Sequence, residues 1–166
     1  MRKIRYILIV LLCFNCFVSY AQAKYDVRNI YGFYRERLPG NIPVDGNGNH
    51  SYKVPDILIT IYIETSGKGP DWVMAWRNGK NYTISLTQVS KTPLEVGINK
   101  KTGNKIVLSP PTGNKLWQLD LMQNDKRIYP PQKTKQGEVL LSGKYQGKTI
   151  FRKIGSLIQL TTFLSV

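Results

Sequence analysis

Two tryptophans in the first half of the chain have the spacing of a ligand platform. Trp72, Met74 and Trp76 occupy alternate positions directly before Asn78-Gly79. Alternate residues of a β-strand project from the same face of the sheet. Indole rings exposed side by side could stack against sugar rings, because they offer a large, rigid apolar contact area. A glycan-binding platform of Trp72 and Trp76 is one interpretation, and burial of the row in the core is the other.

The length of the turn after this row decides between the two interpretations. A two-residue turn would place Trp76 opposite Asn81, and both tryptophans would lie on a polar face. A three-residue turn that includes Arg77 would place Trp76 opposite Lys80 and would turn both indoles to the apolar face. Because burial of a large apolar side chain contributes about 1.5 to 3 kcal/mol, we predict the three-residue turn, with the tryptophan row in the core.

Positive charge is concentrated in the second half of the chain. Residues 91–166 contain 13 Lys and Arg against 4 Asp and Glu, whereas residues 24–90 contain 8 against 6. Such an excess attracts anionic partners. The segment Gln123 to Gly137 is long and charged, and long loops often carry function. We predict that an acidic protein, glycan or lipid head group binds to eight basic residues: Lys126, Arg127, Lys133, Lys135, Lys144, Lys148, Arg152 and Lys153. Nucleic acid is not a predicted partner, because no tight basic run and no nucleic-acid-binding motif is present.

Residues with catalytic or metal-binding chemistry are few. The one histidine, His50, excludes a histidine cluster for zinc and is the only available base for a Ser-His-Asp triad. Glu64 and Asp71 could form a carboxylate pair for glycoside hydrolysis if a hairpin loop joins them. The loop from Asp45 to Asp56 has oxygen ligands at the early positions of a calcium loop but lacks its glycine and its glutamate. A weak calcium loop and an ordinary polar loop both fit it. We predict no catalytic residue, no metal site and no cofactor.

The first residues have the order of charged, apolar and small residues that is typical of a secretory signal peptide. A basic cluster precedes an apolar run from Ile7 to Val18, and alanines follow at Ala21 and Ala23. This order predicts a signal peptide over residues 1–23 and a single β-rich domain over residues 24–166, periplasmic or extracellular, with no transmembrane segment after cleavage. Cys13 and Cys16 lie in the removed segment, so the exported domain has no disulfide. Lipid attachment to either cysteine is the alternative.

Short β-branched and apolar runs, separated by Gly, Asn and Pro, recur along the rest of the chain. They predict an all-β fold, an antiparallel sandwich or small barrel of about eight to nine short strands. Residues Tyr25 to Leu38 differ, because their apolar residues recur at helical spacing; we predict a short helix there, with an edge strand as the alternative. The predicted strands are Asp56 to Thr65, Trp72 to Arg77, Asn81 to Val89, Leu94 to Asn99, Lys105 to Ser109, Leu116 to Met122, Val139 to Tyr145, Thr149 to Lys153 and Leu157 to Leu164.

Two function hypotheses follow from these patterns. The first is an exported, non-enzymatic binding module whose basic second half engages an anionic partner. The second is a carbohydrate-active protein, either a glycan-binding module that uses Trp72 and Trp76 or a glycoside hydrolase. Binding that disappears at high ionic strength would favour the first, and binding that a neutral sugar competes would favour the second. No pattern in the sequence sets the oligomeric state.

Overall fold

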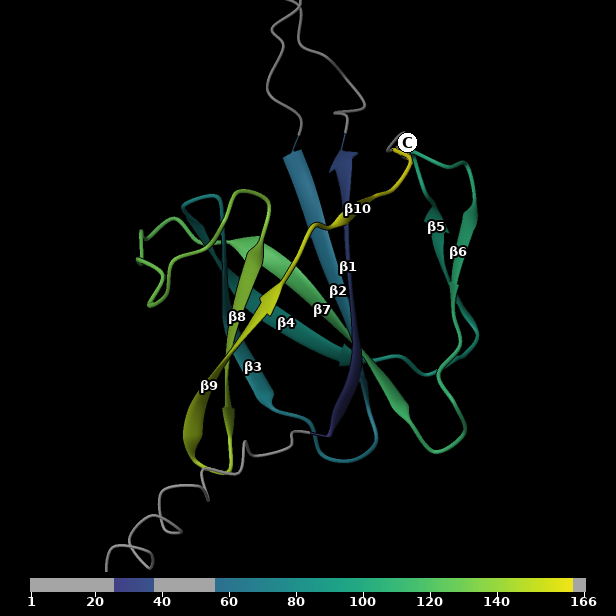
Figure 1. The fold of residues 1–166 in the computed structure, drawn as a ribbon, viewed down its shortest axis with the longest axis horizontal. Coiled ribbons are helices and arrows are strands. Elements are labelled where there is room, and N and C mark those ends of the chain that lie inside the picture. The colour runs from purple at the N-terminus through teal and green to yellow at the C-terminus, as the bar shows by residue number, and fades with distance from the viewer. Residues whose placement is uncertain (1–25, 38–55, 163–166) are drawn as a thin grey trace, which may run out of the picture.

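The computed structural model describes residues 26–37 and 56–162, and this part of the chain is all β (Figure 1). The predicted fold class is therefore confirmed. The described strands are β1 Val27–Arg37, β2 Asp56–Thr65, β3 Asp71–Arg77, β4 Lys80–Gln88, β5 Leu94–Ile98, β6 Lys105–Leu108, β7 Lys115–Gln123, β8 Val139–Tyr145, β9 Lys148–Ile154 and β10 Ile158–Gln159. No helix of the described residues is long and apolar enough to cross a membrane. The predicted signal peptide, Cys13, Cys16, His50 and the loop that begins at Asp45 lie outside the described residues.

Eight of these strands form one curled sheet in the order β10-β1-β2-β7-β4-β3-β8-β9. Neighbouring strands are antiparallel except β1 and β10, which run parallel. The sheet bends into a half-barrel, with β5 and β6 as a separate hairpin beside it (Figure 1). The architecture is thus a half-barrel with an attached hairpin.

The predicted helix at residues 25–38 is wrong, because the described part of this segment is strand β1. It pairs with β2 along its length and with β10 on its other edge, so it is not an edge strand either. Ile30 and Tyr34 pack against the interior of the half-barrel, while Phe33 and Tyr31 pack against the hairpin side. Because both faces of β1 are covered, apolar residues occur on both, and their spacing imitates that of a helix.

The concave face of the sheet encloses the larger core. Ile59, Ile61 and Ile63 alternate along β2, and Leu119 and Leu121 continue their row on β7. Apolar residues of β3, β4, β8 and β9 complete this cluster. Alternation of this kind buries one face of each strand, and it is the same pattern that identified β2 in the sequence.

The chain between β9 and β10 crosses the open side of the half-barrel and connects its two edges (Figure 1). Leu157, on this crossing, is buried together with Ile154 of β9. A Cβ atom added to Gly32 of β1 would lie 2.3 Å from Cδ2 of Leu157, which means that the leucine packs directly on the β1 backbone. The absence of a side chain at Gly32 therefore leaves room for the Leu157 side chain.

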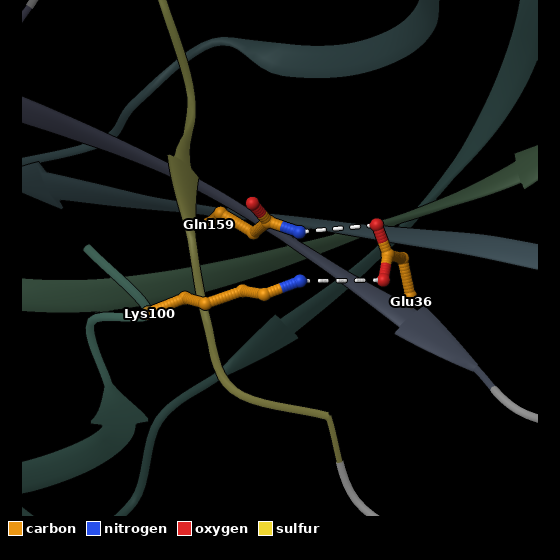
Figure 2. A network of polar contacts seen from close by, with 3 residues as sticks. All are labelled: Glu36, Lys100 and Gln159. Atoms are coloured by element: carbon orange, nitrogen blue, oxygen red, sulfur yellow. Dashed lines mark hydrogen bonds and ion pairs between the residues drawn. The ribbon is translucent and has the colours of Figure 1, made fainter. Parts of the chain in front are cut away.

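The hairpin of β5 and β6 covers the outer face of β1 and β2. Its Val96 and Leu108 are buried with Phe33, Tyr62 and Leu160 in a second cluster. A polar network holds the hairpin to β1 and β10 (Figure 2). The amide of Gln159 donates a hydrogen bond of 3.1 Å to Glu36, whose other oxygen lies 3.5 Å from Nζ of Lys100.

The turn between β3 and β4 has two residues, so the predicted three-residue turn is wrong. Arg77 pairs with Lys80, and Trp76 pairs with Asn81. Asn78 and Gly79 have φ values of 50° and 75°, the left-handed conformation that a type I′ turn requires at both central residues. The structure has the two-residue turn that Asn-Gly prefers. Tertiary contacts bury the face that carries Asn81, although the pattern of polar residues assigned this face to water.

Candidate functional site

The basic segment between β7 and β8 is a loop held against the outer face of the sheet. It stands beside the β3–β4 hairpin at the left of Figure 1. Nε1 of Trp76 donates a hydrogen bond of 2.9 Å to the carbonyl of Ile128. The Asn81 side chain donates one of 3.0 Å to the Lys126 carbonyl and accepts one of 3.1 Å from Ile128 N. At the far end of the loop, Gly137 N donates to Oδ1 of Asn78 over 2.9 Å. The loop is therefore fixed at both of its ends.

Six of the eight predicted basic residues share this outer side, and two do not. The four loop residues, Lys126, Arg127, Lys133 and Lys135, are exposed. Lys144 and Lys153 lie on the outer face of β8 and β9, because they alternate with interior residues, and Lys153 pairs with Leu140 in the row of Trp76. Lys148 and Arg152 fall in register with Tyr145 and Leu141, which face the interior.

One exposed aromatic side chain accompanies the cations of the loop. Tyr129 is 73% exposed. The guanidinium carbon of Arg127 lies 5.0 Å from the centroid of the Tyr129 ring, within the range of a cation–π contact. The loop therefore presents an exposed phenol ring beside a guanidinium group.

Trp72 and Trp76 are both buried, as predicted, but they lie on opposite faces of the sheet. Their exposed fractions are 7% and 5%. Trp76 is covered by the basic loop, whereas Trp72 joins the interior cluster. A register shift between Trp72 and Met74, which leaves Val73 exposed, rotates Trp72 to the concave face. The two indoles do not form one continuous platform.

The carboxylates considered for hydrolysis are also separated. Glu64 lies on β2 and Asp71 on β3, with β7 and β4 between these strands in the sheet. Glu64 is buried and accepts hydrogen bonds from the amides of Asn29, at 2.8 Å, and Asn114. Burial, with a smaller contribution from the Glu64 carboxylate, raises the pKa of Tyr31. No group of three or more His, Cys, Asp or Glu among the described residues could hold a metal ion.

A pocket of about 390 Å³ opens at one end of the half-barrel interior. We name it the indole pocket, because its lining includes Trp72 and Trp117. Ile63 and Leu86 add apolar surface, and the segment 66–70 forms one wall. Trp117 of β7 is partly buried and packs against the interior cluster. Two exposed lysines, Lys68 and Lys115, line the pocket together with Asp71.

A wider hollow of about 580 Å³ lies at the end where β3 and β4 meet. Its lining includes Arg37, Arg77 and Lys80, and none of its described lining residues is acidic. The guanidinium carbon of Arg77 lies 5.3 Å from the centroid of the Tyr34 ring, so this side chain spans the interior from β3 to β1. Burial raises the pKa of Tyr82, and the charge of Arg77 offsets part of that rise.

Neither hollow was predicted from the sequence. The wider hollow was missed because the sequence analysis compared the net charge of the two halves of the chain. Its basic residues belong to the half with almost balanced charge: Arg37, Arg77 and Lys80. A local signal did exist for the indole pocket. Lys115 occupies the same alternating face as Trp117, Leu119 and Leu121, and a charged residue at the end of this apolar row is consistent with an opening there.

Comparison with known proteins gives no match: no protein family, no curated protein and no solved structure is similar to the chain.

Substitution of Gly143 by alanine should displace Trp72 from its place beside the indole pocket. The added Cβ would lie 2.8 Å from the Asp71 carbonyl oxygen and 3.0 Å from Cε3 of Trp72. Because one of these neighbours is backbone, we expect the free energy of unfolding to fall by about 1 to 3 kcal/mol, measured by urea unfolding followed through tryptophan emission. The control is Gly155→Ala, whose Cβ would meet nothing within 4 Å. Equal midpoints for the two variants would contradict the expected overpacking.

Proposed function

We propose that the protein is an exported, non-enzymatic binding module that engages an anionic partner through the basic loop of residues 124–138 and the adjoining outer face of β8 and β9. The supporting observation is that the loop is held by Trp76 and Asn81 while its cations remain exposed. A loop that is already ordered loses less conformational entropy when a partner binds. Positive charges on a fixed surface also raise the rate at which an anionic partner associates.

Two acidic residues, Asp125 and Glu138, also belong to this loop, against four cations. Glu138 is used internally, because its Oε2 accepts a hydrogen bond of 2.8 Å from Lys135 N. The loop therefore keeps a positive balance. Tyr129 would add apolar contact area beside Arg127, and Tyr and Arg are both enriched at protein interfaces.

Reversal of the loop charges should abolish most of the binding to a polyanion. We expect replacement of Lys126, Arg127, Lys133 and Lys135 by glutamate to weaken retention on a sulfated polysaccharide resin and on vesicles containing phosphatidylglycerol. Four exposed contacts of a few tenths of a kcal/mol each give a loss of roughly tenfold or more in affinity. The measurement is the salt concentration at which each protein elutes or dissociates, because screening weakens such contacts.

A matched control separates a defined surface from net charge alone. Replacement of Lys91, Lys101, Lys148 and Arg152 by glutamate makes the same change in net charge at exposed positions away from the loop. We expect this control to retain most of the affinity. Equal losses in the two variants, or a wild-type protein that neither probe retains at low salt, would show that the loop is not the binding surface.

A further inference from the structure

The indole pocket lies on the face of the sheet opposite to the basic loop. Its volume of about 390 Å³ is within the range of small-molecule sites. The pocket is bounded by β2, β7, β4 and the start of β3. We propose that it binds a small planar aromatic anion, whose ring lies against Trp72, Trp117 and Leu86 and whose acidic group meets Lys115 and Lys68.

Both indoles are held in place by contacts that the chain makes on its own. Nε1 of Trp117 donates a hydrogen bond of 3.2 Å to Oγ1 of Thr65. Trp72 is turned inward by the register shift in β3, and its ring lies against Gly143, where a Cβ atom would come within 3.0 Å of it. Aromatic side chains that are already fixed lose little conformational freedom when a ligand binds, and they favour stacked or edge-on contact with another flat ring.

The charges around the pocket select an anion. Lys68 and Lys115 are exposed in its lining, and Asp71 is the one described acidic residue there. Asp71 is in register with Lys144, which lies on the outer face of the sheet, and the two lysines outnumber it in the lining. The remaining ammonium groups, next to an apolar wall, raise the local potential and attract a carboxylate or sulfonate.

The polar groups of the pocket suit a flat aromatic ring better than a neutral sugar. The hydroxyl of Thr65 already accepts a hydrogen bond from Trp117. Leu86, which lines the pocket, is 40% exposed, so part of the apolar wall is open to a ligand. Recognition of a sugar requires several convergent hydrogen-bonding side chains, whereas one acidic group on an apolar ring requires only a cation at the rim.

The three tryptophans provide a direct test with an internal control. Each gives one indole N–H resonance in the ¹⁵N-labelled protein, and Trp→Phe variants assign them. During titration with 2-naphthoate, the resonances of Trp72 and Trp117 should shift saturably. The resonance of Trp76 should not shift, because this side chain lies on the other face and its Nε1 donates a hydrogen bond to the Ile128 carbonyl. An absence of saturable shifts up to millimolar probe, or a shift of Trp76 alone, would overturn the proposal.

Charge variants test the anion selectivity of the same site. We expect Lys115→Gln to weaken 2-naphthoate binding about threefold to tenfold, and Lys101→Gln, on a distant turn, to leave it unchanged. The uncharged analogue 2-naphthalenemethanol should bind more weakly to the wild type. Reversal of the four loop charges should leave the naphthoate shifts intact, which separates this site from the proposed polyanion surface. If Lys115→Gln has no effect while Arg77→Gln weakens binding, the ligand occupies the wider hollow and the proposal is wrong.

Discussion

Replacing Asn81 with alanine should lower the free energy of unfolding by roughly 2 to 4 kcal/mol and loosen the attachment of the basic loop to the sheet at Lys126 and Ile128. The side chain is 3% exposed and makes two hydrogen bonds to the loop, one to the Lys126 carbonyl and one from Ile128 N. Each buried polar group left without a partner costs about 1 to 3 kcal/mol. The unfolding midpoint in urea measures the loss of stability, and limited trypsin digestion measures the loosening, because Lys126 and Arg127 are cleavage sites within the loop.

Thr83→Ala is the matched control for this substitution. Thr83 lies two residues along the same strand on the same face, but it is exposed and its hydroxyl makes one long hydrogen bond of 3.4 Å to the Met122 carbonyl. We expect its substitution to change stability by less than about 0.5 kcal/mol and to leave the loop resistant to trypsin. If Asn81→Ala matched this control in both measurements, Asn81 would not be what holds the loop.

The same variant connects stability to the proposed function. Asn81→Ala keeps every cation of the loop, so a partner that responds only to charge would bind it as well as the wild type. A loop that has been loosened must be ordered again on binding, and this conformational entropy reduces affinity. We therefore expect Asn81→Ala to elute from a sulfated resin at lower salt than the wild type, although its net charge is the same.

The strands could be predicted because their alternation is local. Ile57 to Ile63 in β2 and Trp117 to Leu121 in β7 repeat with a period of two, and the structure places both segments in the sheet. The prediction of a helix at β1 was wrong. Both faces of this strand are buried, which removes the contrast between polar and apolar positions on which periodicity depends. The strands could thus be predicted from neighbours in sequence, whereas the length of the β3–β4 turn and the segments that cover each face of the sheet could not.

The candidate site was harder to predict because its contacts join distant residues. The predicted three-residue turn would have turned Asn81 away from the apolar face, but a loop more than forty residues later covers it. The bulge at Val73, which separates Trp72 from Trp76, has no signal in the pattern of polar and apolar residues. Charge counting drew attention to the four cations of the loop. It could not show that Lys148 and Arg152 lie on the interior face of β9, opposite to the face that the loop covers.

The crossing from β9 to β10 gives the second large effect, because it connects the two edges of the half-barrel. Truncation of Leu157 to alanine should lower the free energy of unfolding by about 2 to 5 kcal/mol, since it removes a buried side chain and leaves a cavity. Ile158→Ala is the control, because its side chain is 40% exposed and its truncation should cost less than about 1 kcal/mol. Both values come from urea unfolding.

A double-mutant cycle with Gly32 tests the contact itself. Gly32→Ala alone should destabilise the protein, because the new methyl group would lie 2.3 Å from Cδ2 of Leu157. In the Leu157→Ala background the conflicting atoms are gone, so the same methyl group should cost less or fill part of the cavity. Residues in direct contact show coupling energies of about 0.5 to 3 kcal/mol. Additive effects of the two substitutions would mean that Leu157 does not pack on β1, and that the edges of the half-barrel are held by β10 pairing alone.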